Sequence, residues 1–327
     1  MKEVARLAGV SPMTVSRALS TPHLVKPETL EQVQSVIRAV GYVPNRVAGS
    51  LSSRRTSLVG LIVPSLRNAL YAETIQGISD VLQRHGLYLM ISDSGYCLER
   101  EEALISAYLA QRPCGLILHN TVHTDAARQM LQGAGVPCVE TGNLPPHPVD
   151  MAVSYSNRAA GRAMAEHLVS RGYRRFGFAS LRIGDNERLR ERRDGFFEGL
   201  RAAGIVIDPA MVLEVGEGLE SGSQALAELM GRDDAVQALF LAGDVLAAGA
   251  IFECARRGLR VPEDIAIAGS DDNDLMQQMV PPITTVRFPR YRIGVRSAEL
   301  IVSRLGDDAL QPTSEDLGFE VVPRGST

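Results

Sequence analysis

The sequence predicts a small all-α N-terminal domain followed by an α/β core in which parallel strands form two similar lobes. Up to residue 41, apolar residues recur at helical spacing between Gly and Pro residues. From residue 57 onward, apolar β-rich runs alternate with amphipathic helices. With 327 residues, 45% of them hydrophobic, the chain is long enough to bury two or three separate cores.

Two short helices joined by a tight turn are expected at the N-terminus. Apolar residues between Val4 and Ala8 follow helical spacing, and Gly9 ends that helix because glycine adopts a left-handed conformation at little cost. Ser11 is a natural N-cap for the next helix, and Pro12 suits its first position. Such a pair of helices is a helix-turn-helix unit.

The second helix has a polar face suited to DNA. Val15 and Leu19 are four residues apart and face inward, which leaves small polar side chains and one arginine on the outside. Hydroxyl groups hold phosphates, and arginine reads guanine in the major groove. The residues predicted to contact DNA here are Ser11, Met13, Thr14, Ser16 and Arg17.

A third helix closes this domain, which we place at residues 1–44. Pro27 begins the helix and Gly41 ends it. Its predicted apolar stripe consists of Leu30, Val33, Ile37 and Val40.

The charge distribution supports a nucleic-acid partner for this domain. Residues 1–57 contain eight lysines and arginines against three acids, a net charge of +5, whereas the rest of the chain carries −9. A basic head on an acidic body is typical of a nucleic-acid binder.

The core is predicted from nine apolar runs that read as buried strands. Amphipathic helices such as "YAETIQGISDVLQRHG" separate most of them, an order that indicates parallel sheets. The runs are "SLVGLIV", "YLMIS", "GLILHN", "PCVET", "MAVSY", "RFGFAS", "ALFLAG", "IAIAGSD" and "TTVRF".

Three stretches together resemble the lactose repressor family of bacterial transcription regulators: "VARLAGVSPMTVSRALS", "GYVPNRVAGSLSSRRT" and "VGLIVPSL". The resemblance runs through essentially the whole chain. It implies that residues 45–56 form a hinge helix that folds on a palindromic operator, where Leu51 enters the minor groove. Asn45, Arg46 and Arg54 then contact DNA with it. From the residues alone, a flexible basic linker remains the alternative, because so short and polar a helix does not persist in water.

The same resemblance implies a periplasmic-binding-protein-like core over residues 57–327, with an effector between two lobes. Lobe one is expected at about 57–155 plus 287–316, and lobe two at about 156–286 plus 317–327. Ligands of such sheets bind at the carboxyl ends of the strands. The candidate effector-binding residues at those ends are Tyr71, Glu140, Arg192, Asp244, Asp271 and Arg290.

The effector is expected to be a sugar acid such as gluconate. Arg192 matches the effector-contacting arginine of the family and Asp271 its hydroxyl-binding aspartate, and an Arg192 and Arg290 pair would favour a planar carboxylate. The stretch "VPSLRNALYAETIQGI" most resembles the gluconate repressor branch. A neutral sugar or another small metabolite, used as a corepressor, is the alternative. The sequence leaves open whether the effector releases or promotes DNA binding.

Other classes of function lack their signatures. The sequence contains no G-x-S-x-G, P-loop or G-x-G-x-x-G motif, so an enzyme is not expected. His119 and His123 have no third metal ligand, and no cofactor or metal is expected. The four scattered cysteines and the lack of an apolar span or signal segment favour a reduced, cytoplasmic protein without membrane contact. We expect a homodimer, with a tetramer as the alternative.

Overall fold

The computed structural model describes residues 1–42, 56–184, 186–232, 236–306 and 313–327. The chain divides into two compact units, Met1–Thr56 and Ser57–Thr327, which are described separately.

The N-terminal unit contains the three expected helices: α1 (Lys2–Leu7), α2 (Pro12–Ser20) and α3 (Pro27–Val40), with a short 3₁₀ turn at Pro22–Leu24. Gly9 and Gly41 both have φ of +60°, as their predicted roles at helix ends require. The Ser11 hydroxyl accepts a hydrogen bond from the backbone N–H of Thr14 at 3.1 Å. The predicted helix-turn-helix geometry is therefore confirmed.

The core of this unit is small, and one predicted member lies outside it. Val4, Ala8, Val15 and Val33 are buried together, but Val40 is 44% exposed. Val40 is the last residue of α3, and Tyr42 packs against the cluster from beyond the Gly41 turn. The prediction that Val40 belongs to the apolar stripe was wrong.

Replacing Ser11 by Ala is expected to destabilise the N-terminal unit by about 1 kcal/mol, because the N–H of Thr14 loses its capping acceptor. Hydrogen exchange of the full-length protein, followed over peptides from residues 12–20, should accelerate about fivefold. Ser57→Ala, at the start of the other unit, is the control. Unchanged protection in Ser11→Ala would show that this cap adds no stability.

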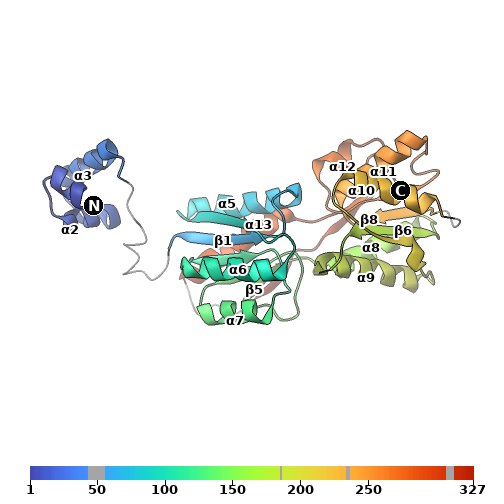
Figure 1. Cartoon of the computed structure of the whole chain (residues 1–327), viewed down its shortest axis with the longest axis horizontal. Helices are drawn as coiled ribbons and strands as arrows, with labels where there is room; N and C mark the ends of the chain where they lie inside the picture. Colours follow the sequence, from blue (N-terminus) through green and yellow to red (C-terminus); the bar gives the residue numbers. More distant parts are fainter. Residues whose placement is uncertain (43–55, 185, 233–235, 307–312) are drawn as a thin grey trace. The chain divides into compact units, whose positions relative to one another are not determined.

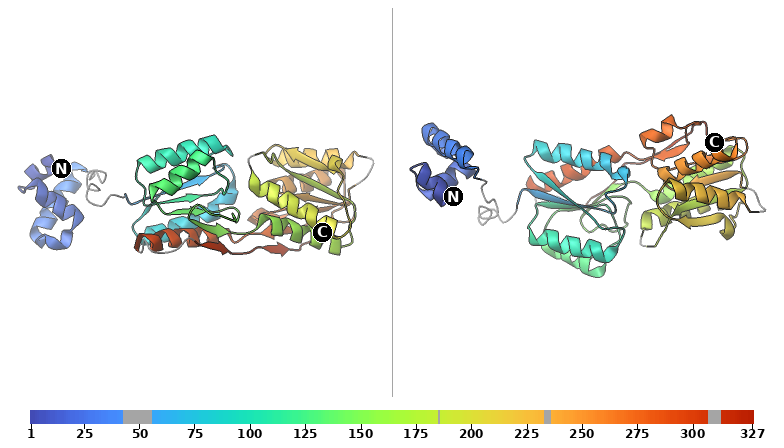
Figure 2. Two further views of the ribbon diagram at one scale, coloured as in Figure 1. Left: turned by 90° about the horizontal axis from the view of Figure 1, so that it is seen from below. Right: turned by 45° about the horizontal axis from the view of Figure 1, so that its top comes forward.

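Lobe one of the C-terminal unit is built on a six-stranded parallel sheet in the order β11-β5-β4-β3-β1-β2. Helices α5 and α13 lie side by side over one face of the sheet, and α6 and α7 cover the other (Figures 1 and 2). The strands are β1 (Leu58–Val63), β2 (Tyr88–Asp93), β3 (Gly115–Leu118), β4 (Cys138–Glu140), β5 (Met151–Ser154) and β11 (Ser314–Asp316). The helices are α5 (Ala72–Arg84), α6 (Leu98–Ala110), α7 (Asp125–Ala134) and α13 (Arg290–Gly306).

Lobe two has a four-stranded parallel sheet in the order β7-β6-β8-β9. Helices α8 and α9 lie on one side of it and α10 and α11 on the other (Figure 1). Its strands are β6 (Phe176–Leu181), β7 (Val212–Val215), β8 (Ala238–Leu241) and β9 (Ala266–Ala268). Its helices are α8 (Asn157–Ser170), α9 (Glu187–Ala202), α10 (Leu219–Met230), α11 (Asp244–Arg257) and α12 (Asp274–Gln278).

Three connections join the lobes: the segment after β5, the segment from β10 (Thr285–Arg287) into α13, and the segment from β11 into β12 (Glu320–Val322). Strands β10 and β12 pair antiparallel as a separate ribbon. All nine predicted apolar runs contain strands, and the α/β fold with two parallel sheets is confirmed. The sequence did not reveal β7, β11 and β12, which are short and partly exposed.

Pairs of helices approach each other closely at reciprocal glycines, here called the glycine crossings. A Cβ built on Gly161 of α8 would lie 1.9 Å from the carbonyl oxygen of Arg192 in α9, and one on Gly195 would lie 1.9 Å from that of Arg158 in α8. Only glycine allows backbones this near. The same arrangement recurs between α5 and α13 at Gly77 and Gly294, and between α10 and α11 at Gly222 and Gly249.

Candidate effector site and DNA-binding surface

The residues predicted to contact DNA lie around the start of α2. Met13 is 71% exposed, Ser16 and Arg17 are exposed, and Thr14 is half-buried. The hydroxyls of Ser11 and Thr14 are 2.9 Å apart at the N-terminal end of the helix, where backbone N–H groups favour a phosphate. The surface is therefore compatible with the predicted contacts. The predicted hinge residues Asn45, Arg46, Leu51 and Arg54 lie outside the described residues.

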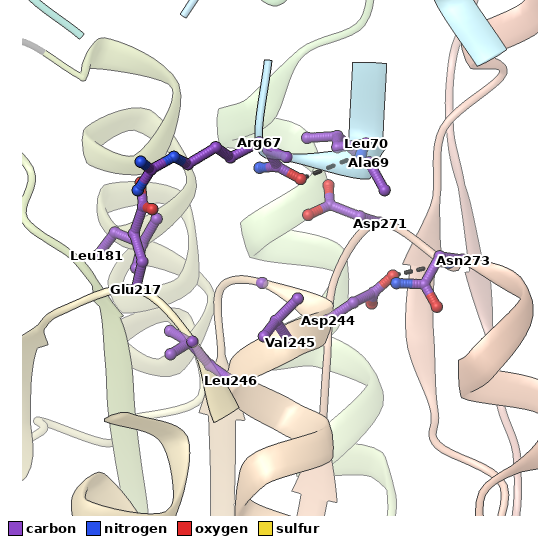
Figure 3. A pocket seen from close by; sticks show the side chains of 13 residues that line it. Arg67, Ala69, Leu70, Leu181, Glu217, Asp244, Val245, Leu246, Asp271 and Asn273 are labelled. Atoms are coloured by element: carbon purple, nitrogen blue, oxygen red, sulfur yellow. Dashed lines mark hydrogen bonds between the residues drawn. The ribbon is translucent and has the colours of Figure 1, made fainter. Parts of the chain in front are cut away.

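The C-terminal unit contains a cavity of about 350 Å³ between the strand ends of the two lobes (Figure 3). Lobe one contributes Arg67 and the residues after it, and lobe two contributes Leu181, Glu217 and the start of α11. In Figure 3 the guanidinium of Arg67 extends toward Glu217. Of the predicted effector-binding residues, Asp244 and Asp271 line this cavity.

A smaller cavity of about 70 Å³ adjoins the first one, because both are lined by Asn68, Leu181 and Asp271. Tyr71, in the short 3₁₀ turn Ala69–Tyr71, and Arg192, in the second turn of α9, line it. The structure therefore gathers four of the six predicted effector-binding residues at one place. Residues that were not predicted to bind the effector complete the smaller cavity; they include Tyr96, His119, Tyr155, Asn186 and Arg188.

Arg192 is buried in a set of polar contacts. Its Nη1 donates to the Ser270 hydroxyl at 2.5 Å and lies 3.6 Å from Asp271 Oδ1. Its Nη2 donates to Asn157 Oδ1 at 2.8 Å, and its guanidinium lies 5.0 Å from the ring centre of Phe288. These contacts fix the orientation of the side chain, while its Nε has no hydrogen-bond partner among the described residues.

Arg188 lies one helical turn before Arg192 and also faces the smaller cavity. Its Nη1 donates to the carbonyl oxygen of His119 at 3.0 Å and to Asn120 Oδ1 at 3.4 Å. The spacing of four residues in "RLRER" puts both arginines on one face of α9. This spacing is a signal in the sequence from which Arg188 could have been predicted alongside Arg192.

The structure does not bring Arg290 and Glu140 to the cavities. Arg290 begins α13, donates through Nη1 to the backbone carbonyl of Asp271, and lies 3.4 Å from a carboxylate oxygen of Glu73. Glu140 is fully buried, with its Oε1 3.3 Å from Nε2 of His123. Arg188 and Arg192, and not the expected pair of Arg192 and Arg290, line the smaller cavity, because Arg290 turns to the Asp271 loop instead.

Asp244, one of the two aspartates that line the larger cavity, is buried. Burial, together with the nearby charge of Asp271, raises the pKa of Asp244 well above its ordinary value. Its Oδ2 accepts the backbone N–H of Asn273 at 2.7 Å, and its Oδ1 has no hydrogen-bond partner in the described part of the chain. Asp244 can therefore offer a buried carboxyl oxygen to a ligand hydroxyl.

His119 contributes a neutral ring to the smaller cavity. Burial and the charges of Arg188 and Arg290 lower its pKa well below the ordinary value. The ring packs edge-on against Tyr71 with centroids 4.8 Å apart, and its Nδ1 lies 2.9 Å from the Thr141 hydroxyl. Neutral imidazole and tyrosine rings make a wall suited to the apolar face of a small polar ligand.

The arginines, aspartates and aromatic rings around the two cavities are suited to binding a small molecule. Among the described residues, no group of three or more His, Cys, Asp or Glu side chains could hold a metal ion. No helix in the described ranges is long and apolar enough to cross a membrane. A capped helix-turn-helix unit in one chain with a two-lobed core around a cavity that contains a few charged side chains defines a class of protein, the DNA-binding regulators that sense a small molecule.

Comparisons with known proteins agree with that class. Residues 1–45 match the family of bacterial regulatory proteins of the lacI type, and residues 165–327 match a periplasmic binding protein-like domain. The whole chain is 36% identical to the HTH-type transcriptional regulator GntR of Pseudomonas aeruginosa and covers 95% of it.

Solved structures give the same result. A LacI-family transcriptional regulator from Silicibacter pomeroyi is 34% identical with a TM-score of 0.93, over 99% of this chain and 98% of that one. The lac repressor dimer bound to operator and the anti-inducer ONPF is 25% identical with a TM-score of 0.84, over 99% and 98%. The chain belongs to the LacI family and is a DNA-binding transcriptional regulator, so the predicted family and the prediction of a regulator in place of an enzyme are confirmed.

Proposed function

We propose that this regulator is a repressor that binds a palindromic operator as a homodimer and is released by a sugar acid such as gluconate. The observation that carries the proposal is the pair of buried guanidinium groups, Arg188 and Arg192, on the wall of the smaller cavity. Arginine is the side chain best suited to a carboxylate, because its planar N–H groups match both oxygens. The resemblance to the gluconate repressor branch points to the same ligand class.

The ligand carboxylate would face Arg188 and Arg192, and the polyol chain would extend into the larger cavity. There Asp244 and Asp271 would accept hydrogen bonds from the ligand hydroxyls. Asn273 also lines this cavity, and its backbone N–H donates to Asp244. A volume of about 350 Å³ falls within the range of about 300–1,000 Å³ typical of small-molecule sites. Tyr71 would pack against the carbon chain.

DNA binding would use the start of α2 and the predicted hinge. Ser11, Thr14 and Ser16 would contact phosphates and Arg17 a base, while Met13 can offer a thymine methyl only apolar contact. Leu51 would enter the minor groove, while Asn45, Arg46 and Arg54 would contact DNA beside it, with Arg54 next to phosphate. The lac repressor dimer on its operator supports a twofold arrangement on a palindromic site.

A neutral sugar is the second candidate. The larger cavity has three acidic side chains on its wall, Glu217, Asp244 and Asp271, and carboxylates bind sugar hydroxyls well. One related solved structure, 31% identical, is the transcriptional regulator CelR in complex with cellobiose. In that case Arg188 and Arg192 would bind sugar hydroxyls, and loss of either arginine would weaken the binding of sugar acids and of neutral sugars equally.

Isothermal titration calorimetry of the full-length protein separates the candidates. We expect saturable binding of gluconate in preference to glucose, weakened roughly 10- to 150-fold by Arg188→Met or Arg192→Met, because each removes charge-assisted hydrogen bonds. Arg193→Met is the matched control, since Arg193 lies on α9 but pairs with Asp194. Binding of glucose at least as tight as that of gluconate, and weakened equally with it by loss of either cavity arginine, would contradict the sugar-acid proposal.

The DNA arm of the proposal needs a separate titration. Palindromic duplexes selected from a random pool should bind the wild-type protein, and gluconate should weaken that binding about 5- to 150-fold. Tighter binding in the presence of gluconate would identify it as a corepressor and overturn release by the effector.

A further inference from the structure

A set of hydrogen bonds links the two lobes beside the smaller cavity. The loop after β3 in lobe one, His119–Thr121, meets the first turn of α9 in lobe two. Arg188 donates to the His119 carbonyl and to Asn120, and the Thr121 hydroxyl donates to the Glu187 carboxylate. We call residues 119–121 together with Glu187 and Arg188 the lobe latch.

The lobe latch is shielded from water. The exposed fractions of Asn120, Thr121, Glu187 and Arg188 lie between 6% and 9%. Hydrogen bonds that involve a charged partner are stronger than neutral ones, and low exposure reduces their competition with water. Contacts of this kind can therefore bias how the lobes are arranged, which exposed ion pairs rarely do.

A buried cluster of side chains next to the latch orients Asn120, whose Oδ1 accepts a hydrogen bond from Arg188. Asn120 donates through Nδ2 to Glu101 Oε2 at 3.2 Å and to the Val122 carbonyl at 2.7 Å, so its Oδ1 is turned toward Arg188. Glu101 in turn lies 2.5 Å from Nδ1 of His123, and the other ring nitrogen of His123 lies 3.3 Å from Glu140. We call Glu101, His123 and Glu140 the buried triad.

In front of the latch, the stem of Arg188 is confined. Gly142 has a φ of +95°, and a Cβ there would lie 3.0 Å from both Arg188 Cδ and His119 Nε2. The carbonyl of Gly142 accepts from Asn157, which also accepts from Arg192. The latch, Gly142 and Asn157 thus place both arginines on the wall of the same cavity.

We propose that the lobe latch is a positioning device: it turns Arg188 into the cavity only in the latched lobe arrangement, so that an anionic ligand and the latch stabilise each other. The ligand class rests on the proposed function, but the latch itself does not. A ligand shifts an equilibrium only by its differential affinity for the two states, and Arg188 supplies that difference here. Asn120 and Thr121, which line neither described cavity, are positioning residues. The buried triad keeps the side chain of Asn120 oriented toward Arg188.

The first arm of the test needs no ligand. Hydrogen exchange of full-length Asn120→Ala and Thr121→Val should rise severalfold in peptides covering residues 186–192, although both substitutions lie in the other lobe. Thr74→Val is the matched control, because the Thr74 hydroxyl bonds within lobe one to the Arg290 carbonyl. Unchanged exchange in α9 in both latch variants would overturn the latch.

The second arm measures gluconate binding by calorimetry and operator affinity with and without gluconate. Both latch variants keep Arg188 and Arg192, yet we expect gluconate to bind 3- to 10-fold more weakly and the ratio of operator affinities to move toward one. Wild-type affinity in both variants would overturn the positioning role. Failure of the wild-type protein itself to bind gluconate would contradict the proposed function, while the exchange experiment still decides the latch.

Discussion

Replacing His123 by leucine is expected to destabilise the C-terminal unit by about 3–5 kcal/mol, because it leaves two buried carboxylates without their shared counter-charge. The side chains of Glu101, His123 and Glu140 are almost completely enclosed, so water cannot replace the lost partner. Leucine fills a similar volume, which keeps the loss of charge separate from a packing defect.

Urea unfolding of the full-length protein at pH 7 measures this loss. His85→Leu is the matched control, because His85 is exposed at the end of α5, and it should change stability by less than about 0.5 kcal/mol. An equal, small effect of both substitutions would show that the buried triad carries no stabilising charge.

The same residue predicts how stability depends on pH. Burial alone would lower the pKa of His123, but hydrogen bonds and charges from Glu101 and Glu140 outweigh it and raise the pKa to about 9. Because the folded-state pKa exceeds the unfolded value near 6.5, the stabilisation is complete below about pH 6.5 and is lost as pH rises to 9. The loss is about 3 kcal/mol. In His123→Leu this part of the pH profile should be flat.

Gly195→Ala is expected to cost about 3 kcal/mol of stability, at the upper end for overpacking, because its Cβ would collide with the backbone carbonyl of Arg158. The collision cannot be relieved by a side-chain rotation, so α8 and α9 must separate. Arg192 lies one turn earlier on α9 and is held by Asn157 on α8. Gluconate affinity should therefore fall together with stability.

Gly133→Ala is the matched control for that variant. Gly133 lies within α7 with no atom near its Cβ position, and alanine there should stabilise the protein by about 0.5–1 kcal/mol. Thermal unfolding and calorimetry compare the two. If both alanine variants unfold at the same temperature, the contact between α8 and α9 tolerates a methyl group and the glycine crossing is not required.

Much of the fold was readable because its signals are local. Gly9, Ser11 and Gly41 mark helix ends through backbone conformation and a single hydrogen bond, and neither depends on the rest of the chain. The edge strands β7 and β11 were missed because edge positions are half exposed and carry acids such as Glu214 and Glu315, which break the apolar pattern.

The candidate site was less predictable because the end of a strand fixes a residue's position but not the direction of its side chain. Glu140 ends β4, yet its carboxylate turns to His123, which is 17 residues earlier in the sequence and reaches it only through the fold. Arg290 follows β10 and turns back to the Asp271 loop. Four other arginines lie close to Arg188 in the sequence: Arg182, Arg190, Arg192 and Arg193. Only its spacing of four residues from Arg192, which puts both on one helix face, distinguishes Arg188.

The glycine crossings also determine which parts of the molecule can move. At these glycines the backbones are in direct contact, so the paired helices cannot slide past each other without a clash and each pair is expected to move as one unit. Any change in the angle between the lobes is then absorbed by the segment after β5 and by the paths through β10 and β12. Strands β10 and β12 themselves pack on α8, so the segments that follow β5 and β10 and precede β12 are where backbone torsions would differ between two functional states.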